Sequence, residues 1–379
     1  MSKIPLSQLP EPQIVAPDYL STLTRLKKGY EQGTGHYPLV SDPETFLLEQ
    51  TAYERELIVD DINREAKQNL LAFADDAMLD HLGALVDCQR LPANPALTTL
   101  QLTLTTPHPA LVLQAGITVR AVDGETVFST TNTISVAADV TTVTISAEST
   151  TPGTQGNGFL PGEIHELVSA PPVILAAVNT EMSQGGSDIE DNDRYRYRIY
   201  LAPSKFSVAG PYDAYEYWTL TANGAITSAK VWSPVPNDIS VCALLSGGEP
   251  AGNAIKQEIL DTLSDDKVRP LGDRVTVEDA TQVLAAGTFS LEIFSDYQAM
   301  ASNIETQFSA ALSATLAAWR EQLGRDIVPE ALTRLGQQIQ GVYRCTTDLA
   351  FIALERNQNP MITIDAINVS ITTEASLGG

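Results

Sequence analysis

The spacing of apolar residues changes along this chain, and each spacing predicts a different kind of element. Between residues 42 and 86, apolar side chains recur every three or four positions, as on one face of a helix. Asp42 followed by Pro43 is a typical helix start, and Asp75 with Asp76 starts a second, shorter helix. The predicted stripe consists of Ile58, Ile62, Ala66, Leu70 and Phe73. Two helices this short cannot bury that stripe alone, so we expect it to pack on another domain or another chain.

Residues 1–40 are rich in proline and contain few regularly spaced apolar residues. They predict an extended arm with one short helix over residues 19–26. An arm of this kind often docks on a neighbouring subunit, and its composition is equally compatible with disorder.

From residue 96 to about 178 the apolar period drops to two. Leu100, Leu102 and Leu104 alternate with polar neighbours, which indicates a strand with one buried face. Residues 118–122 and 125–129 flank Asp123 and Gly124, a strong hairpin signal. Residues 142–146 alternate again. The pattern predicts an antiparallel β domain, either a small sandwich or a barrel.

Beyond residue 225 the pattern predicts strands and helices in alternation. The first group has strands at 226–232, 239–245 and 273–277 and a helix at 253–263. The second has strands at 289–294, 348–353 and 362–371 and helices at 303–323 and 329–339. This order is typical of one or two mixed α+β modules.

The fold class predicted from these patterns is α+β multidomain, with N-terminal helices, an antiparallel β domain and one or two mixed modules. The expected domains are an N-terminal arm (1–40), a helical segment (41–95), the β domain (96–180), an α+β core (181–287) and a C-terminal α+β module (288–379).

The segment after residue 184 carries clear signals for the start of a helix. Gly185 and Gly186 predict a turn, after which Ser187 or Asp188 would cap the helix. Acidic residues then precede arginines, an order that suits the helix dipole. These residues are Glu190, Asp191, Asp193, Arg194, Arg196 and Arg198. We also expect an i, i+4 ion pair between the first acid and the first arginine of this set.

Proline and glycine predict the next boundaries. Pro203 should end the first helix, and Pro211 should occupy the first position of the next one. Asn223 and Gly224 should end that second helix.

Composition narrows the possible classes. A chain of 379 residues with 43% hydrophobic residues can build two or three domains with true cores. Its net charge of −24 argues against nucleic acid as a partner, because phosphate binding needs an excess of Lys and Arg. The acidity is compatible with solubility or with docking on basic proteins.

The sequence also argues against a membrane location. No apolar run approaches the length of a spanning helix, and the N-terminal residues lack the apolar core of a signal peptide. We therefore expect the chain to stay in the cytoplasm where it is made. Cys88, Cys242 and Cys345 are odd in number and widely spaced, which favours reduced, buried thiols.

Candidate chemical groups are weakly supported. Glu163 and His165 would share one face of a strand, but no second His or Cys nearby completes a metal set, so an exposed pair is favoured. The acids around residue 190 lack the glycine and distal glutamate of a calcium loop. Gly247 and Gly248 lack the lysine of a phosphate-binding loop. We expect no catalytic, cofactor-binding or metal-binding residues.

A series of aromatic residues could stack on sugars or line an interface, although a core between two helices is favoured. The series is Tyr195, Tyr197, Tyr200, Tyr212, Tyr215, Tyr217 and Trp218. No feature of the sequence selects the pair of carboxylates that a glycosidase would need.

Three stretches together resemble the baseplate J-like family. The most specific is residues 185–218, which fit the pattern GGSDIEDND…R…I…P..FSVAGP..AYEYW. Its key positions are Gly185, Gly186, Ser187, Asp188, Arg194, Arg198, Phe206, Gly210 and Pro211. Residues 41–90 resemble the family's N-terminal helices. Residues 267–277, KVRPLGDRVTV, contain Arg269 and Pro270 and resemble its VRP-L-x-D-x-V-x-V element. The resemblance runs from about residue 41 to 280, and the remainder matches only loosely.

The resemblance implies a structural subunit with no known chemistry, part of the wedge in the baseplate of contractile-tailed bacteriophages. Such a wedge joins the central hub to the sheath, with two copies of the subunit per wedge in different arrangements, in a ring that widens on contraction. The implied partners are a second copy, a second wedge subunit, the sheath-initiator protein and the central hub or spike, with neither nucleic acid nor membrane. The implied location is the virion, after assembly in the host cytoplasm. Contractile bacteriocins and injection machines carry similar subunits.

Two other functions stay open. A receptor- or sugar-binding tail protein would need an exposed aromatic cluster on the loops of residues 96–178, which contain only Phe128 and Phe159 as aromatic residues. A cell-wall hydrolase of the tail would degrade peptidoglycan in a zymogram. For the structural function, we expect Ile58, Ile62 and Phe73 to form the contact with a partner helix, and the C-terminal module to contact neighbouring subunits.

Overall fold

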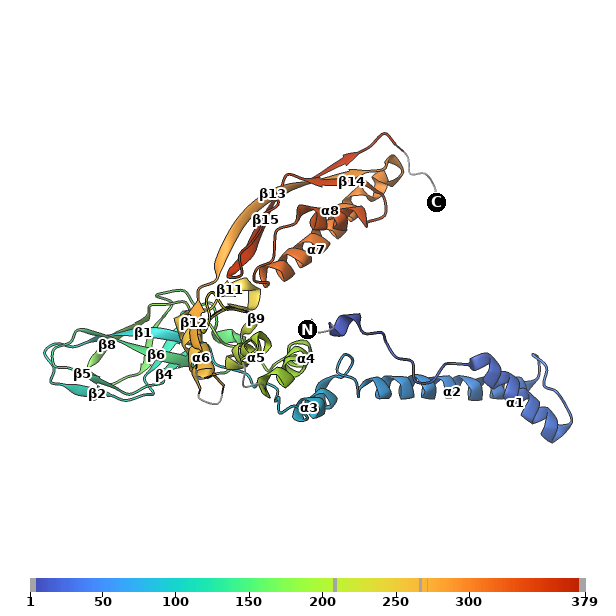
Figure 1. The fold of residues 1–379 in the computed structure, drawn as a ribbon, viewed down its shortest axis with the longest axis horizontal. Helices are drawn as coiled ribbons and strands as arrows, with labels where there is room; N and C mark the ends of the chain where they lie inside the picture. Colours follow the sequence, from blue (N-terminus) through green and yellow to red (C-terminus); the bar gives the residue numbers. More distant parts are fainter. Residues whose placement is uncertain (1–4, 207–209, 266–267, 271, 375–379) are drawn as a thin grey trace. The chain divides into compact units, whose positions relative to one another are not determined.

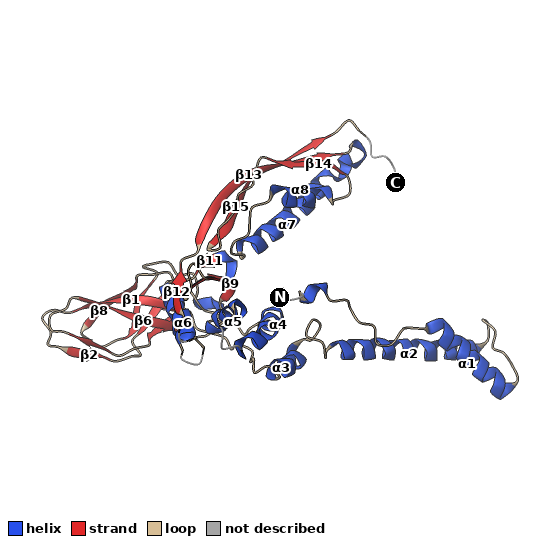
Figure 2. Cartoon of the chain, in the orientation of Figure 1, coloured by secondary structure: helices blue, strands red, loops and turns tan. Residues whose placement is uncertain are grey.

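The structure is a computed structural model that describes residues 5–206, 210–265, 268–270 and 272–374. The chain forms two compact units. The first contains the residues up to Arg90 together with Asp191–Tyr200, and the second contains Leu91–Glu190 and the residues from Leu201 onward. Figure 1 follows the chain from blue to red, and Figure 2 shows that the strands belong to the second unit.

The first unit is helical throughout its described part. Its elements are η1 (Leu6–Gln8), α1 (Tyr19–Thr34), α2 (Pro43–Lys67), α3 (Asp76–Ala84) and α4 (Asn192–Leu201). The helix predicted at residues 19–26 is twice that length, because Asp18 caps its start and Gly35, with φ +77°, ends it. Asn63 of α2 binds the arm that precedes α1: its Oδ1 accepts from Ile14 and Val15 N–H at 3.0 and 2.9 Å.

Two expectations for α2 need correction. The helix ends at Lys67, so Leu70 and Phe73 lie beyond it and cannot continue the predicted stripe. Asp42 stands at the predicted N-terminal position but makes no capping bond. Its Oδ2 accepts instead from Leu39 N–H at 2.7 Å, a bond that lowers the pKa of the Asp42 carboxyl.

The second unit begins with the predicted antiparallel β domain. Its strands are β1 (Leu97–Leu104), β2 (Leu111–Leu113), β3 (Thr118–Ala121), β4 (Val127–Thr130), β5 (Ile134–Val136), β6 (Thr142–Ser149), β7 (Ile164–Ser169) and β8 (Ile174–Asn179). Six of them pair in the order β7-β3-β4-β6-β1-β8, and β7 also approaches β8, so the sheet is a nearly closed barrel. β2 and β5 form a separate two-stranded sheet, whose Leu113 and Val136 belong to the same core.

The period-two pattern correctly predicts which side chains fill the barrel. Burial alternates along β1, with Leu100, Leu102 and Leu104 buried in its core beside Phe128. The hairpin predicted around Gly124 is also confirmed, since β3 and β4 pair in antiparallel register and Gly124 has φ +77°.

The next part of the second unit mixes helices and strands as predicted. Its elements are α5 (Tyr212–Ala222), β9 (Ile226–Trp232), β10 (Asp238–Leu245), β11 (Glu249–Pro250), α6 (Asn253–Ser264) and β12 (Arg274–Glu278). β10 is central, antiparallel to β9 and β11 and parallel to β12. Short 3-10 helices also occur in the second unit: η2 (Thr154–Gly156), η3 (Ala202–Phe206), η4 (Ser246–Gly248) and η5 (Ser295–Met300).

The C-terminal part is a three-stranded sheet with two helices packed on it. Its elements are β13 (Thr281–Ile293), α7 (Ala301–Arg320), α8 (Pro329–Gln337), β14 (Val342–Thr347) and β15 (Gln358–Ile371). The strand order is β14-β13-β15; β13 is antiparallel to β14 and parallel to β15. Helix α7 packs on β15 and α8 on β14 (Figure 1).

The strand predicted at residues 348–353 is wrong. The strand lies earlier, as β14, and the ladder ends where Asp348 Oδ1 accepts from Thr288 N–H at 2.7 Å. The apolar residues of the predicted strand, including Leu349 and Ile352, pack in the C-terminal core instead. Their burial produces the same apolar pattern that a strand would show.

Candidate functional site

The backbone of the turn at residues 185–188 is held by hydrogen bonds from two other segments. Gly186 N–H donates to Asn157 Oδ1 at 2.8 Å, and Asn157 Nδ2 donates to Gly186 O at 2.7 Å. Ser187 and Asn94 exchange two backbone hydrogen bonds of 2.8 and 3.1 Å. The turn therefore joins the entry to β1 with the loop that follows β6.

Close packing explains the two glycines of this turn. A Cβ on Gly185 would lie 2.4 Å from Ile255 Cδ1 of α6, and the residue has φ +88°. A Cβ on Gly186 would lie 2.4 Å from Gly153 O in the loop after β6. The first glycine is thus required by α6 and the second by the barrel loop.

Ser187 and Asp188 do not cap α4, contrary to the prediction. The carboxylate of Asp188 accepts from Thr154 N–H and Thr154 Oγ1, both at 3.3 Å. Helix α4 begins later, at Asn192, and its capping acceptor is Asp191, whose Oδ1 accepts from Arg194 N–H at 2.9 Å.

Glu190 lies before the helix, so the predicted i, i+4 helical geometry with Arg194 does not apply. Its side chain is 5% exposed, and its Oε2 accepts from Leu91 N–H at 3.0 Å. The sequence predicted that Glu190 interacts with the dipole of the helix. In the structure its carboxylate instead binds the backbone of Leu91, the first residue of the second unit.

Tyr195 of α4 fastens this helix to the end of α3. Its hydroxyl donates to Cys88 O at 2.7 Å, and Arg90 lies over its ring at 4.6 Å. Gly83 of α3 makes room, because a Cβ there would lie 2.0 Å from the hydroxyl oxygen. Burial raises the pKa of Tyr195 to about 12, so the hydroxyl remains a donor at neutral pH.

The arginines of α4 bind backbone carbonyls of the first unit. Arg198 is 1% exposed and its Nη1 donates to Gln89 O at 3.2 Å. Arg196 Nη2 donates to Ala74 O at 2.8 Å and to Asp75 Oδ1 at 3.0 Å. Their main function is to fix the helix in place, which the dipole argument did not anticipate.

Gly210 of the signature segment and Pro270 of the VRP element pack together beside Tyr215. Gly210 has φ +62°, and a Cβ there would lie 2.8 Å from Pro270 Cγ and 3.1 Å from Asp273 Oδ2. Tyr215 donates its hydroxyl to the same Asp273 oxygen at 2.6 Å. Burial raises the pKa of Tyr215, and the hydrogen bond to Asp273 raises it further. Two motifs about sixty residues apart thus form one packed cluster.

The other predicted positions near this cluster differ in exposure. Arg269 and Pro211 are half-buried, and Pro211 stands one residue before α5 rather than at its first position. Phe206 is 64% exposed. Ser207–Ala209 of the signature loop, and Lys267 and Leu271 of the VRP element, lie outside the described residues.

The aromatic series is divided between the two units. Tyr195 is buried in the first, and Tyr215 and Tyr217 are buried in the second, as a core assignment predicts. Tyr197 and Tyr212 are 43% and 56% exposed, so the series does not form a single core.

The candidate chemical groups lie apart. His165 is exposed on β7, and Glu163 Oε2 accepts from Leu160 N–H at 2.7 Å. Within the described residues, no cluster of three or more His, Cys, Asp or Glu side chains is suitable for a metal ion. In the same residues, no helix combines the length and the apolar character needed to cross a bilayer. All three cysteines are buried and have reduced thiols, as predicted.

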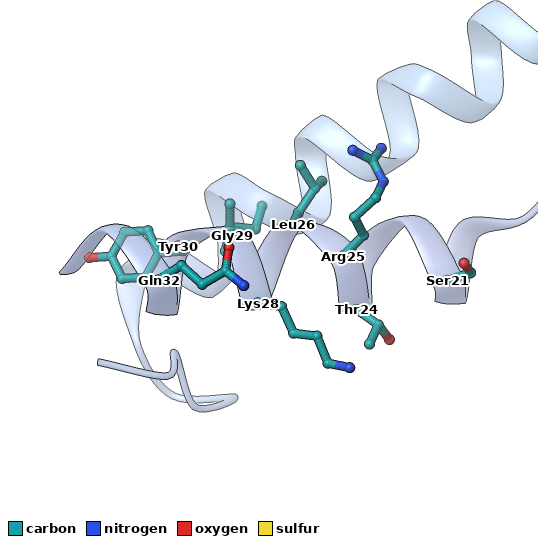
Figure 3. A pocket seen from close by; sticks show the side chains of 9 residues that line it. Ser21, Thr24, Arg25, Leu26, Lys28, Gly29, Tyr30 and Gln32 are labelled. Atoms are coloured by element: carbon teal, nitrogen blue, oxygen red, sulfur yellow. The ribbon is translucent and has the colours of Figure 1, made fainter. Parts of the chain in front are cut away.

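A pocket of about 890 Å³ lies along α1. Eight of its nine lining residues belong to α1, and Leu48 of α2 is the ninth (Figure 3). Its ionisable side chains are Arg25, Lys28 and Tyr30, with no acid, histidine or cysteine.

Several exposed apolar side chains lie along α2 in the first unit. Ile58 and Ile62, both predicted, are 57% and 45% exposed. Phe46, Leu47 and Tyr53 are 63%, 65% and 53% exposed, and sequence reasoning missed them. The side chains that α2 does bury are Thr45, Ala52, Val59 and Asn63, on another face. The exposed apolar side chains are spread over more than one stripe of the helix, which blurs the period-3.6 signal and explains the omission.

Three family models match the chain in sequence order. The baseplate J-like N-terminal domain matches residues 41–96, the baseplate J-like protein barrel domain matches 99–186, and the baseplate J-like central domain matches 207–279. Together they cover more than half of the chain. The second match coincides with the barrel described above.

Individual proteins give related matches. Baseplate protein J of Escherichia phage P2 is 30% identical over 182 residues, which is 46% of this chain and 58% of that protein. A chain in the cryo-EM structure of the anti-feeding prophage baseplate aligns over 90% of both chains, with 11% identity and a TM-score of 0.36. The three domain matches, in their order along the chain, lead to one conclusion: the chain belongs to the baseplate J-like family.

Proposed function

We propose that this chain is a structural wedge subunit of a contractile tail baseplate, joining the central hub to the sheath. Family membership supports a structural component of the baseplate. The observation that carries the finer assignment is the exposed apolar surface of α2. Because these side chains are already partly buried, completing the burial of each against a partner would contribute roughly 1 kcal/mol, and several of them together would stabilise the contact.

The proposed partners are a second copy of the chain, a second wedge subunit, the sheath-initiator protein and the central hub or spike. The α2 surface contacts the helical partner within a wedge, and the C-terminal sheet contacts a neighbouring wedge. A contact that repeats around an axis closes into a ring. A ring that widens on contraction requires interfaces with two discrete packings. The location is the virion, with assembly in the host cytoplasm and no catalytic step.

The test is co-expression of the chain with the products of its neighbouring genes, followed by purification and electron microscopy. We expect a stable complex in which this chain binds other baseplate proteins through its first unit. Recovery of the chain alone, with no stable complex under any combination of partners, would contradict the proposal.

A further inference from the structure

Within the second unit, a very short stretch of chain connects the part that contains α5 to β12, here the central part, with the C-terminal part. β12 ends at Glu278 and β13 begins at Thr281, so only Asp279 and Ala280 lie between them. A few residues of this kind can act as a hinge by absorbing a large change in backbone angles. The contacts between the two parts therefore decide whether they move separately.

One buried asparagine binds both parts. Asn359 of β15 is 0% exposed, and its Nδ2 donates to Gly248 O at 3.0 Å and to Arg320 O at 2.8 Å. Gly248 belongs to η4 of the central part, whereas Arg320 ends α7 of the C-terminal part. Arg320 also forms an ion pair with Glu249 of β11. A Cβ on Gly248 would clash with the Arg320 backbone, so only glycine permits this close approach.

Two more hydrogen bonds connect η4 with the C-terminal part. Gln282 Nε2 of β13 donates to Gly248 O at 3.2 Å, so this carbonyl accepts from two side-chain amides. Gly247 N–H donates to Glu321 Oε1 at 2.7 Å. Backbone groups of the central part are thus paired with side chains of the C-terminal part, and separation would break every one of these bonds.

An apolar contact completes the junction. Leu323, which follows α7, is 5% exposed and packs with Cys242 and Leu244 of β10. Trp232 and Ala280 border the same cluster. Leu323 of the C-terminal part is therefore buried by residues of the central part, and separation would expose it to water.

We propose that Asn359 holds the central and C-terminal parts together as one rigid body, so that residues 279–280 do not act as a hinge in the folded chain. Opening the junction would leave the carbonyls of Gly248 and Arg320 without their buried donor, which is costly. The inference goes beyond the proposed function. If the chain works in a ring that widens on contraction, the movement occurs elsewhere than at this junction; that consequence rests on the proposed function, whereas the rigid junction itself does not.

Two buried thiols of the chain report whether the junction opens. Cys242 is buried at the junction, and Cys345 is buried in the core of the C-terminal part. A thiol reagent reaches Cys242 when the two parts separate, but it reaches Cys345 only when the C-terminal part itself unfolds. The full natural chain is treated with iodoacetamide, and mass spectrometry gives the modification rate of each cysteine. We expect Cys242 to react no faster than Cys345. Faster modification of Cys242 would show that the junction opens by itself and would overturn the proposal.

Asn359→Asp tests the asparagine directly. The charged carboxylate keeps the shape of the amide but has no donor for the two carbonyls. Asn368→Asp is the matched control, because Asn368 is exposed on the same strand. We expect modification of Cys242 to be at least tenfold faster in Asn359→Asp, with the rate at Cys345 unchanged, and natural rates in the control. An unchanged rate at Cys242, or equal acceleration at both cysteines, would contradict the proposed role of Asn359.

Leu323→Ala provides a second test, because Leu323 belongs to the cluster at the junction and not to the buried core around Cys345. It should accelerate modification of Cys242 alone; no change would mean that the junction does not cover this thiol. All these measurements use the isolated chain, so they are independent of assembly. A chain with a closed junction that forms no complex with baseplate proteins would contradict the proposed function and leave the rigid junction standing.

Discussion

A substitution at Gly210 tests whether the contact between the signature segment and the VRP element contributes to stability. Gly210→Val would strain a backbone at φ +62° and push a side chain against Pro270. We expect a loss of about 2–4 kcal/mol in unfolding free energy, measured with urea. Gly124→Val is the matched control, because Gly124 has φ +77° and nothing within 4 Å of an added Cβ. It should lose only the part due to strain; equal losses would show that the contact with Pro270 is unimportant.

His108 gives the barrel a pH-dependent contact. Its Nδ1 lies 2.7 Å from Pro109 O and its Nε2 lies 2.9 Å from Val140 O. Only the protonated ring donates to both, so these bonds raise the pKa of His108, with a smaller contribution from Asp139. A raised folded-state pKa stabilises the fold fully below the unfolded value of about 6.5, and the stabilisation is lost as pH rises through the folded value.

The measurement compares melting temperatures of the natural chain and His108→Gln from pH 5.5 to 8.5. The natural chain should be more stable at pH 5.5, and the difference should shrink as the pH rises. A difference that stays constant with pH would show that the ring is neutral in the folded protein.

At the scale of elements, α2 carries only part of the predicted contact surface. Ile58 and Ile62 lie on the helix and are exposed, whereas Phe73 lies beyond it and is half-buried. Ile58→Glu with Ile62→Glu should therefore leave the chain folded and block association with the helical partner, measured by co-purification. Val112→Glu with Leu175→Glu, at exposed apolar positions of the barrel, is the control and should assemble normally. Equal assembly of both variants would remove the proposed function of α2.

Most elements follow from local patterns. The predictions that failed did so where contacts between distant residues decide the structure. β9 coincides with its predicted residues, and α6 and β12 begin and end within one residue of theirs, because periodicity and turn residues agree there. The strand predicted at residues 348–353 was wrong because burial against helices and burial within a sheet leave similar apolar patterns. Ser187 and Asp188 do not cap the helix because they form hydrogen bonds with distant residues, Asn94 and Thr154.

At the scale of the whole molecule, the first unit includes a segment from the middle of the sequence. Residues 191–200 fold with the N-terminal helices, where Tyr195 and Arg198 are buried. A chain that starts at Leu91 would expose both side chains. We expect limited proteolysis to cut this truncated chain within residues 191–200 while the barrel survives, and the full chain to resist at that site. Equal resistance would show that α4 needs no cover from the N-terminal helices.

The sequence by itself determined the type and order of most elements, the barrel's inward residues and the family, because these depend on neighbours within a few positions. Only the tertiary structure decided what the signature residues do. The sequence assigned the arginines to a helix dipole and the glycines to turns. In the structure they make contacts with residues far along the chain, such as Arg198 with Gln89 and Gly210 with Pro270. Packing between residues far apart in sequence has no local period, so the fold had to supply it.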